Sequence, residues 1–396
     1  MPIVNPDVLI WARESMGFSA EEAARKIGLN DGVRASAIEK LAAIESGEKA
    51  PSRPQLLRMS QQYKKPLLTL YMREPPVRGN RGQDFRTLPA GLPPEDNAYL
   101  DVLIRDVQAR QSLLRETLVQ EDDAEPVRFI GRLTMEQGVT HAANVLRELL
   151  HFELDDFRQN RTVENAFKYA REHVEAKGVF VLLIGNLGSH HTNISTSTFR
   201  GFALSDDIAP LIVINDQDAK SAWSFTLLHE IVHLLLAQTG VSNAYADNQI
   251  EKFCNDVASE SLLPAAELNN LVLEDDDIEG LTNSINQFAV PRKISGRMVA
   301  YRLLRSERIP QQVWRQIEGH MNQLWLAARG RQREANRGTD SGPSYYIVRR
   351  YKLGNSLLNF TQRMMNTGAL TATRAGFLLG VKPLKVHRLF QTTNAA

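Results

Sequence analysis

Apolar residues recur at helical spacing along most of the chain, and two short runs are apolar at nearly every position. Helical spacing marks short segments near the N-terminus, a long segment over residues 96–120, and two more over 134–150 and 163–176. The continuous apolar runs at 178–184 and 211–214 predict buried strands. The pattern therefore predicts an α+β fold that is mostly helical and contains a small sheet.

The first 76 residues are expected to form a bundle of short helices, the second of which opens at a capping-box pattern on Ser19. The segment resembles the Cro/repressor-like (XRE) helix-turn-helix domain in S-A-E-E-A-A-R-K-I-G and E-S-G-E-K. It departs from that domain in the stretch before E-S-G-E-K, which is longer than usual and carries only Arg34 and Lys40 as basic residues. Residues 1–75 hold 11 basic and 9 acidic residues, whereas DNA binding draws on Lys and Arg. Two alternatives stay open: a DNA-reading domain, or a bundle used for docking or dimerisation.

An apolar segment over residues 225–236 contains the sequence H-E-I-V-H and is predicted to be a helix that runs through a core. His229 and His233 are four residues apart, so they project from one face of this helix, one turn apart. Two imidazoles at this spacing can bind one tetrahedral Zn²⁺ and leave positions open for water. Glu230 follows the first histidine and can reach that water as a general base.

A third ligand is expected from the helix that follows. Glu251 lies eighteen residues after His233 and opens a segment with helical spacing. In this the two segments resemble thermolysin-like peptidases, in which a glutamate from a following helix, at about this separation, completes the His2Glu zinc set. Asn255 lies one turn beyond Glu251, where it is expected to hold a ligand histidine by its second ring nitrogen.

Two motifs together resemble the ImmA/IrrE family of metallopeptidases. The first is H-E-I-V-H, and the second is E-K-F-C-N-D-V-A-S-E-S-L-L-P, over residues 251–264. The family's second motif reads approximately E-x-x-A-N-x-F-A-x-E-L-L-M-P, so Cys254, Val257 and Leu263 are departures that conserve packing. The resemblance covers roughly residues 77–275. It implies a zincin-like zinc endopeptidase whose substrates are typically repressors or antitoxins with helix-turn-helix domains.

The resemblance and the residues predict a peptidase in which His229, His233 and Glu251 hold the zinc ion and Glu230 is the catalytic base. Its partner would be a repressor or antitoxin in transcriptional or stress and phage-type regulation. The alternative is a DNA-binding regulator or antitoxin whose zinc site is structural or sensory. The intact Glu230 favours catalysis, because a structural site has no use for a general base.

Composition is that of an ordinary globular protein, with 43% hydrophobic and 23% charged residues. No apolar run approaches the roughly 20 residues of a membrane span, and residues 1–20 lack a signal-peptide layout. A single cysteine, Cys254, excludes an internal disulfide and fits a reducing cytoplasm. We expect Cys254 to be a buried packing residue, with a fourth metal ligand as the alternative.

Charge is distributed unevenly. Residues 280–396 hold 19 Lys and Arg against four acidic residues, a net charge of +15. This region is expected to meet a polyanion, an acidic partner or the rest of this chain. It is predicted to contain two helix–turn–helix pieces, one of which carries the candidate DNA contacts. These contacts are Arg292, Lys293, Arg297 and Arg302, with packing on the peptidase as the alternative.

The Pro- and Gly-rich stretch at residues 75–82 is the clearest linker. The predicted domains are therefore an XRE-like domain over 1–76, a peptidase domain over 77–278 and a basic helical region over 279–396. Residues 329–338, rich in Arg and Gly, are expected to be a connector. A homodimer is a further candidate assembly.

Three smaller features of the sequence offer a role at the site or a purely structural one. His190 and His191 are read as loop histidines, with a substrate contact as the alternative. Tyr245 is a candidate oxyanion donor that the sequence does not place. The acidic run 274–277 is read as a solvated boundary loop, because adjacent carboxylates repel one another.

Overall fold

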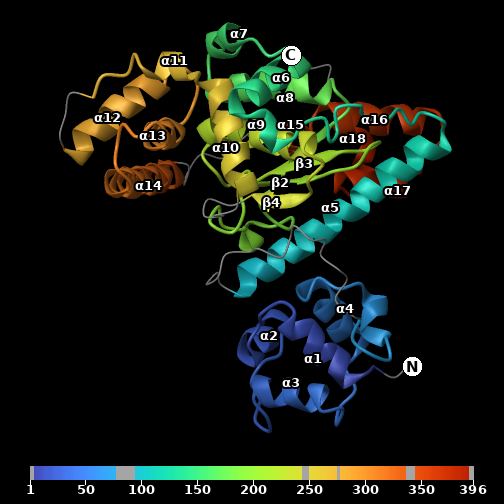
Figure 1. Cartoon of the computed structure of the whole chain (residues 1–396). Helices are drawn as coiled ribbons and strands as arrows, with labels where there is room; N and C mark the ends of the chain where they lie inside the picture. The colour runs from blue at the N-terminus through green and yellow to red at the C-terminus, as the bar shows by residue number, and fades with distance from the viewer. Residues whose placement is uncertain (1–3, 77–93, 243–248, 274–276, 336–343, 392–396) are drawn as a thin grey trace. The chain divides into compact units, whose positions relative to one another are not determined.

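The structure is a computed structural model that describes residues 4–76, 94–242, 249–273, 277–335 and 344–391 (Figure 1). The chain divides into two compact units. The first unit contains residues 1–106 and 186–198, and the second contains residues 107–185 and 199–396. This division differs from the three domains expected from the sequence, which stay a prediction.

The first unit is a bundle of short helices. Asn5 caps the first of these helices, and Ser19 and Glu22 form the predicted capping box at the start of the second. Lys40, one of the two basic residues expected near a DNA-reading helix, donates a hydrogen bond of 2.7 Å to the carbonyl of Asn30. The helices are α1 (Pro6–Glu14), α2 (Ala20–Lys26), α3 (Ala37–Glu45), α4 (Arg53–Gln62), η1 (Leu67–Tyr71), the first part of α5 (Pro94–Gln120) and η4 (His190–Thr192). The XRE resemblance of this unit stays a prediction.

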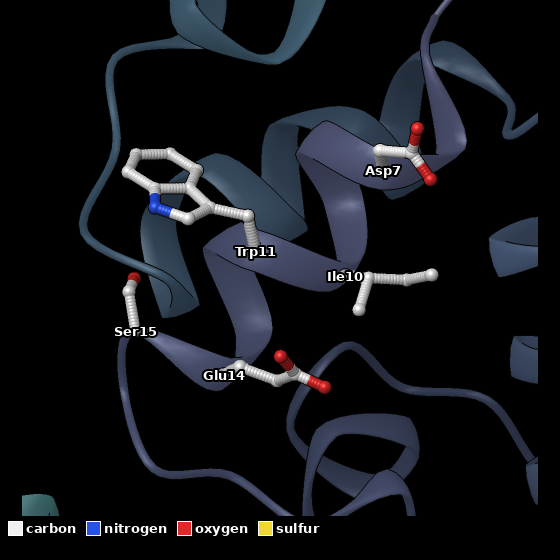
Figure 2. A pocket seen from close by; sticks show the side chains of 5 residues that line it. All are labelled: Asp7, Ile10, Trp11, Glu14 and Ser15. Carbon is white, nitrogen blue, oxygen red and sulfur yellow. The ribbon is translucent and has the colours of Figure 1, made fainter. Parts of the chain in front are cut away.

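A pocket lies beside α1 in this unit (Figure 2). Its lining residues are Asp7, Ile10, Trp11, Glu14 and Ser15, all from α1 or its C-cap. Two carboxylates and an indole on one helix surface make no set of metal ligands, and the hydroxyl of Ser15 donates a hydrogen bond to the carbonyl of Ala12 and not to a base. The pocket is therefore not a candidate catalytic site.

The second unit combines a four-stranded sheet with the remaining helices, which confirms a mostly helical α+β fold. The strands are β1 (Phe180–Leu183), β2 (Gly201–Leu204), β3 (Leu211–Ile214) and β4 (Gly240–Ser242). The helices before the last strand are η3 (Met135–Gln137), α6 (Val139–Leu150), α7 (Leu154–Gln159), α8 (Val163–Glu175), η5 (Lys220–Ala222) and α9 (Trp223–Leu235). Those after it are α10 (Gln249–Leu262), α11 (Ala265–Leu268), α12 (Ile278–Ala289), α13 (Gly296–Arg305), α14 (Gln311–Ala335), α15 (Tyr345–Leu353), α16 (Asn355–Asn366), α17 (Ala372–Leu379), η6 (Pro383–Lys385) and α18 (Val386–Gln391).

The sheet has the strand order β1-β3-β2-β4. β1 runs parallel to β3, while β2 is antiparallel to both β3 and β4. The register pairs Gly201 with Ile214 and Ala203 with Ile212. Because side chains alternate along a strand, these residues share one face of the sheet. That face carries the core on which α8 and α9 pack (Figure 1).

The two strands expected from continuous apolar runs are present as β1 and β3. β2 and β4 were not predicted. The expected connector over 329–338 is wrong for its first part, because α14 continues to Ala335. The helical turns over 329–335 contain Arg and Ala, which favour helix, and only one interior glycine. Residues 336–338 lie outside the described part of the chain.

Basic residues of the C-terminal region pair with acidic residues earlier in the second unit. The pairs are Arg292 with Glu267, Arg302 with Glu260, Arg305 with Asp256, Lys352 with Asp216, Arg363 with Asp123 and Arg374 with Glu116. Part of the positive charge of the C-terminal region is thus paired within this unit. This agrees with one of the three expectations from the sequence, that the region meets the rest of this chain. No helix in the described residues combines the length and apolarity that a membrane crossing requires.

Candidate metal centre

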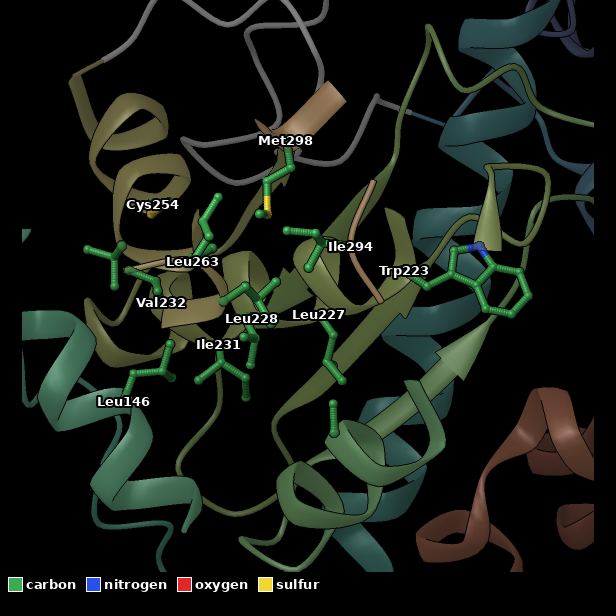
Figure 3. Close-up of a cluster of buried hydrophobic side chains, with 14 of the residues drawn as sticks. Leu146, Trp223, Leu227, Leu228, Ile231, Val232, Cys254, Leu263, Ile294 and Met298 are labelled. Atoms are coloured by element: carbon green, nitrogen blue, oxygen red, sulfur yellow. The ribbon is translucent and has the colours of Figure 1, made fainter. Parts of the chain in front are cut away.

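Helix α9 carries the H-E-I-V-H sequence through the centre of the second unit. Twelve of its thirteen residues are buried, and the helix packs against α8, α10 and strands β2 and β3, with its apolar side chains in one buried cluster (Figure 3). A helix that is apolar all round must be buried in this way. The prediction of a core helix is confirmed, and it follows that His229, Glu230 and His233 are held in a rigid, apolar surround.

The two histidines and Glu251 converge. Glu251 lies in the first turn of α10, which packs along α9. The Nε2 atoms of His229 and His233 are 3.1 Å apart, and each lies 3.3 Å from a carboxylate oxygen of Glu251. All three side chains are buried, and they form a group whose ligand atoms lie within 4.8 Å of one another.

These separations fit a metal ion. A tetrahedral Zn²⁺ with bonds of about 2.0–2.1 Å separates its ligand atoms by about 3.3–3.4 Å. The observed 3.1–3.3 Å between the three donors is close to this edge length. Two imidazole nitrogens and one carboxylate oxygen are also the donor types that zinc takes in catalytic sites. The residues present therefore fit a zinc ion without rearrangement.

The charge state of Glu251 also suits a ligand. Burial by itself raises the pKa of this carboxyl, but hydrogen bonds and charge from His229 and His233 outweigh burial and hold the pKa well below its ordinary value. Metal ligands bind in their deprotonated form. Glu251 is therefore an anion across the physiological pH range.

Neighbouring groups on α10 have other partners. Tyr301 donates a hydrogen bond of 2.8 Å to Asp256, and Arg305 contacts both oxygens of the same carboxylate. Glu260, the other acidic residue that could replace Glu251 as a ligand, pairs with Arg302. Glu251 is thus the acidic side chain of α10 that the fold turns toward the histidines.

Cys254 is fully buried among the apolar side chains between α9 and α10, and it is not part of the three-residue group (Figure 3). Burial raises the pKa of its thiol well above the ordinary value, so the thiolate that a metal requires is disfavoured. The packing role expected for Cys254 is therefore favoured over the ligand role.

The remaining residues that the sequence suggested for the site lie in different parts of the structure, and some lie outside its described residues. Asn255 is half-buried one turn after Glu251, and its contact with a ligand histidine stays a prediction. His191 is an exposed residue of η4 in the first unit. Tyr245 and residues 274–276 lie outside the described residues. Asp277 caps α12 through a hydrogen bond from Gly280, so it has a structural role.

Two of the four candidate DNA-contacting residues, Arg292 and Lys293, lie in the turn between α12 and α13, and the other two, Arg297 and Arg302, lie in α13. Arg292 stacks on Phe288 and pairs with Glu267 at 2.7 Å, while Arg302 is buried against Glu260. Arg297 donates to the side chain of Asn322 at 3.0 Å, and Lys293 is half-buried in a left-handed turn. The contacts of Arg292 and Arg302 favour the packing alternative. DNA binding by this region stays a prediction.

One residue at the site was missed by sequence reasoning. Gly201, the first residue of β2, lies against the carboxylate of Glu230 and the methyl group of Thr226. A glycine at the start of a continuous buried run was the available signal, because it can mark a close approach of the backbone to another group.

Comparison with known families supports the resemblance. Residues 175–304 match the family Peptidase_M78, described as an IrrE N-terminal-like domain. Searches of curated proteins and of solved structures found no match. The matched segment spans about a third of the chain and includes His229, Glu230, His233 and Glu251, but not the N-terminal helices. The match and the buried ligand group together support a metallopeptidase domain of the ImmA/IrrE type within this segment.

Proposed function

We propose that this protein is a zinc-dependent endopeptidase that cleaves a protein partner, of the class of helix-turn-helix repressors or antitoxins. One observation carries the proposal: two histidines and a glutamate converge with ligand spacing, and a buried glutamate follows the first histidine on the same helix. The partner class is taken from the family resemblance, and a role in transcriptional or stress regulation follows from that class.

The residues would divide the chemistry between them. His229, His233 and Glu251 would hold the zinc ion, which when bound lowers the pKa of a water molecule and polarises the scissile carbonyl. Glu230 would accept the proton of that water and pass it to the leaving amine. Because Glu230 is fully buried, its carboxylate acts in a low-dielectric surround where its charge has a strong effect.

The donor count favours catalysis over a structural role for zinc. Structural zinc sites are closed by four protein ligands, whereas catalytic sites use three and keep one position open. The ligand group in the described residues comprises three side chains. Cys254 and Asp256, the nearest further candidates on α10, are engaged in packing and in ion pairing.

Co-expression with the products of neighbouring genes tests the proposal. Wild type should shorten one partner, and Glu230→Gln should leave that partner intact while it keeps its zinc, because the base is lost and the ligands remain. A partner shortened equally by both proteins would reject the assignment.

A further inference from the structure

The backbone of one residue in β2 lies directly against the proposed general base. Gly201 pairs with Ile214 of β3 and with Ser242 of β4. It shares a face of the sheet with Ala203, two residues further along, and Ala203 packs in the same buried cluster as α9. Gly201 thus lies on the face of the sheet toward the helix that carries the metal ligands.

A side chain at this position would overlap Glu230. A Cβ atom added to Gly201 would lie 2.7 Å from Oε1 of Glu230 and 2.7 Å from Cγ2 of Thr226. Favourable contacts between such atoms occur at about 3.5–4.0 Å. Glu230 is 0% exposed and Thr226 is buried, so neither side chain can swing into solvent to relieve the overlap.

Backbone conformation does not account for this glycine. The φ angle of Gly201 is outside the left-handed region in which ten other described glycines lie. Glycine within a strand lowers stability, because the unfolded chain gains freedom and no side chain packs. What Gly201 provides is space. The Glu230 carboxylate and the Thr226 methyl group come closest to it, and the carbonyl oxygen of Val213 would lie 3.1 Å from an added Cβ.

We propose that Gly201 is a positioning residue for Glu230. Thr226 lies one turn before Glu230 on the same face of α9, and both side chains approach the backbone of β2 at Gly201. Any side chain at position 201 displaces the carboxylate from this place. The kinetic consequence rests on the proposed function, whereas the steric relation between Gly201 and Glu230 does not.

The kinetic test is Gly201→Ala in the zinc-loaded full chain. Displacing a reacting group by about 1 Å can lower a rate about 100-fold, so kcat for cleavage of the partner should fall about 10- to 100-fold. KM should change less than about twofold, because the substitution acts on the position of the base. The control is Ala203→Gly, a change of one methyl group on the same strand face, which should leave kcat within about twofold. Wild-type kcat in Gly201→Ala would overturn the proposal.

A second test reads stability and needs no activity. Gly201→Ala should lower the unfolding temperature of the wild-type chain by several degrees. In a Glu230→Ala chain the same substitution should lower it by less, because the overlap with the carboxylate is gone while the overlap with Thr226 remains. Equal shifts in the two backgrounds would overturn the proposal. If Gly201→Ala alone does not fold, Gly201→Ala with Thr226→Ser and Glu230→Ala must recover the fold, because both overlapping side-chain groups are then gone. Failure to recover it, or equal recovery with Thr226→Ser alone, would overturn the proposal.

The two tests separate this inference from the proposed function. Coupling between positions 201 and 230 in a chain whose wild type cleaves no partner would refute the peptidase assignment while supporting the steric placement of Glu230. Cleavage that depends on Glu230 but not on Gly201 would support the peptidase assignment and refute the positioning role of Gly201.

Discussion

A buried ion pair between Arg171 and Glu175 joins the C-terminal helices to the sheet, and breaking it should release them. Both side chains are 6% exposed, and Nε of Arg171 lies 3.0 Å from Oε1 of Glu175. Arg171 also donates to the carbonyls of Tyr351 and Lys352 at the end of α15 and to that of Val181 in β1.

Glu175 completes this junction from the other side. Its Oε2 atom accepts hydrogen bonds of 3.1 Å from the backbone N–H groups of Asn355 and Ser356, at the start of α16. A carboxylate at a helix N-terminus satisfies donors that the helix itself cannot pair. The pair therefore connects α8, β1, α15 and α16 in one buried network.

Arg171→Ala would leave the Glu175 carboxylate buried without its cation. Removing one partner of a buried pair costs about 3–5 kcal/mol. Since each 1.4 kcal/mol is about a tenfold change in an equilibrium constant, hydrogen exchange of the amides in α15 and α16 should accelerate by about 100- to 1,000-fold or more. Exchange in α1 to α4, within the first unit, should not change.

Arg363→Ala is the matched control. Arg363 pairs with Asp123 and also connects the C-terminal helices to the unit, but its side chain is 55% exposed. Exposed pairs contribute under about 1 kcal/mol, so exchange in α16 should accelerate less than about tenfold. If Arg171→Ala changes exchange no more than Arg363→Ala does, the buried pair does not hold these helices and the reasoning is wrong.

Two further predictions concern the site and the acid stability of the fold. In a metal titration, Glu251→Ala should weaken zinc binding about 10-fold or more. Asp256→Asn should bind zinc like wild type, because Asp256 pairs with Arg305. Full zinc binding by Glu251→Ala would mean that another residue is the third ligand. Burial raises the pKa of Glu267, but Arg158 and Arg292 outweigh it and lower the pKa, so the unfolded chain takes up this proton first and stability should fall as pH drops below about 4.3. Glu267→Gln should flatten that part of an unfolding profile against pH, and an unchanged profile would refute this role.

The sequence predicted those parts of the structure that depend on local pattern. Helix α9 was predicted because its apolar residues surround the motif, and β1 and β3 because each is a continuous apolar run. The ligand group was predicted because histidines four apart on a helix must share a face, and because a glutamate from the following helix, at the separation of Glu251, completes a His2Glu site. In each case the decisive residues lie close together in the sequence.

What was missed depends on contacts between distant residues. The role of Gly201 requires knowledge of which helix packs on β2, and Glu230 lies on a helix nearly thirty residues later. The pairing of Arg363 with Asp123 joins positions 240 residues apart. The net charge of the C-terminal region could therefore indicate contact with the rest of the chain only as one of three alternatives. The connector expected over 329–338 was wrong over residues 329–335, because Arg and Gly content was given more weight than the helical spacing that precedes it.

Cleavage of a purified partner by zinc-loaded wild type and by zinc-loaded Glu230→Gln tests the central claim most directly. With equal zinc content in both proteins, we expect wild type to convert the partner to two fragments and Glu230→Gln to produce none within the same time, because the base is removed while His229, His233 and Glu251 remain. Equal rates of fragment formation by the two proteins would contradict the assignment of Glu230, and with it the peptidase mechanism.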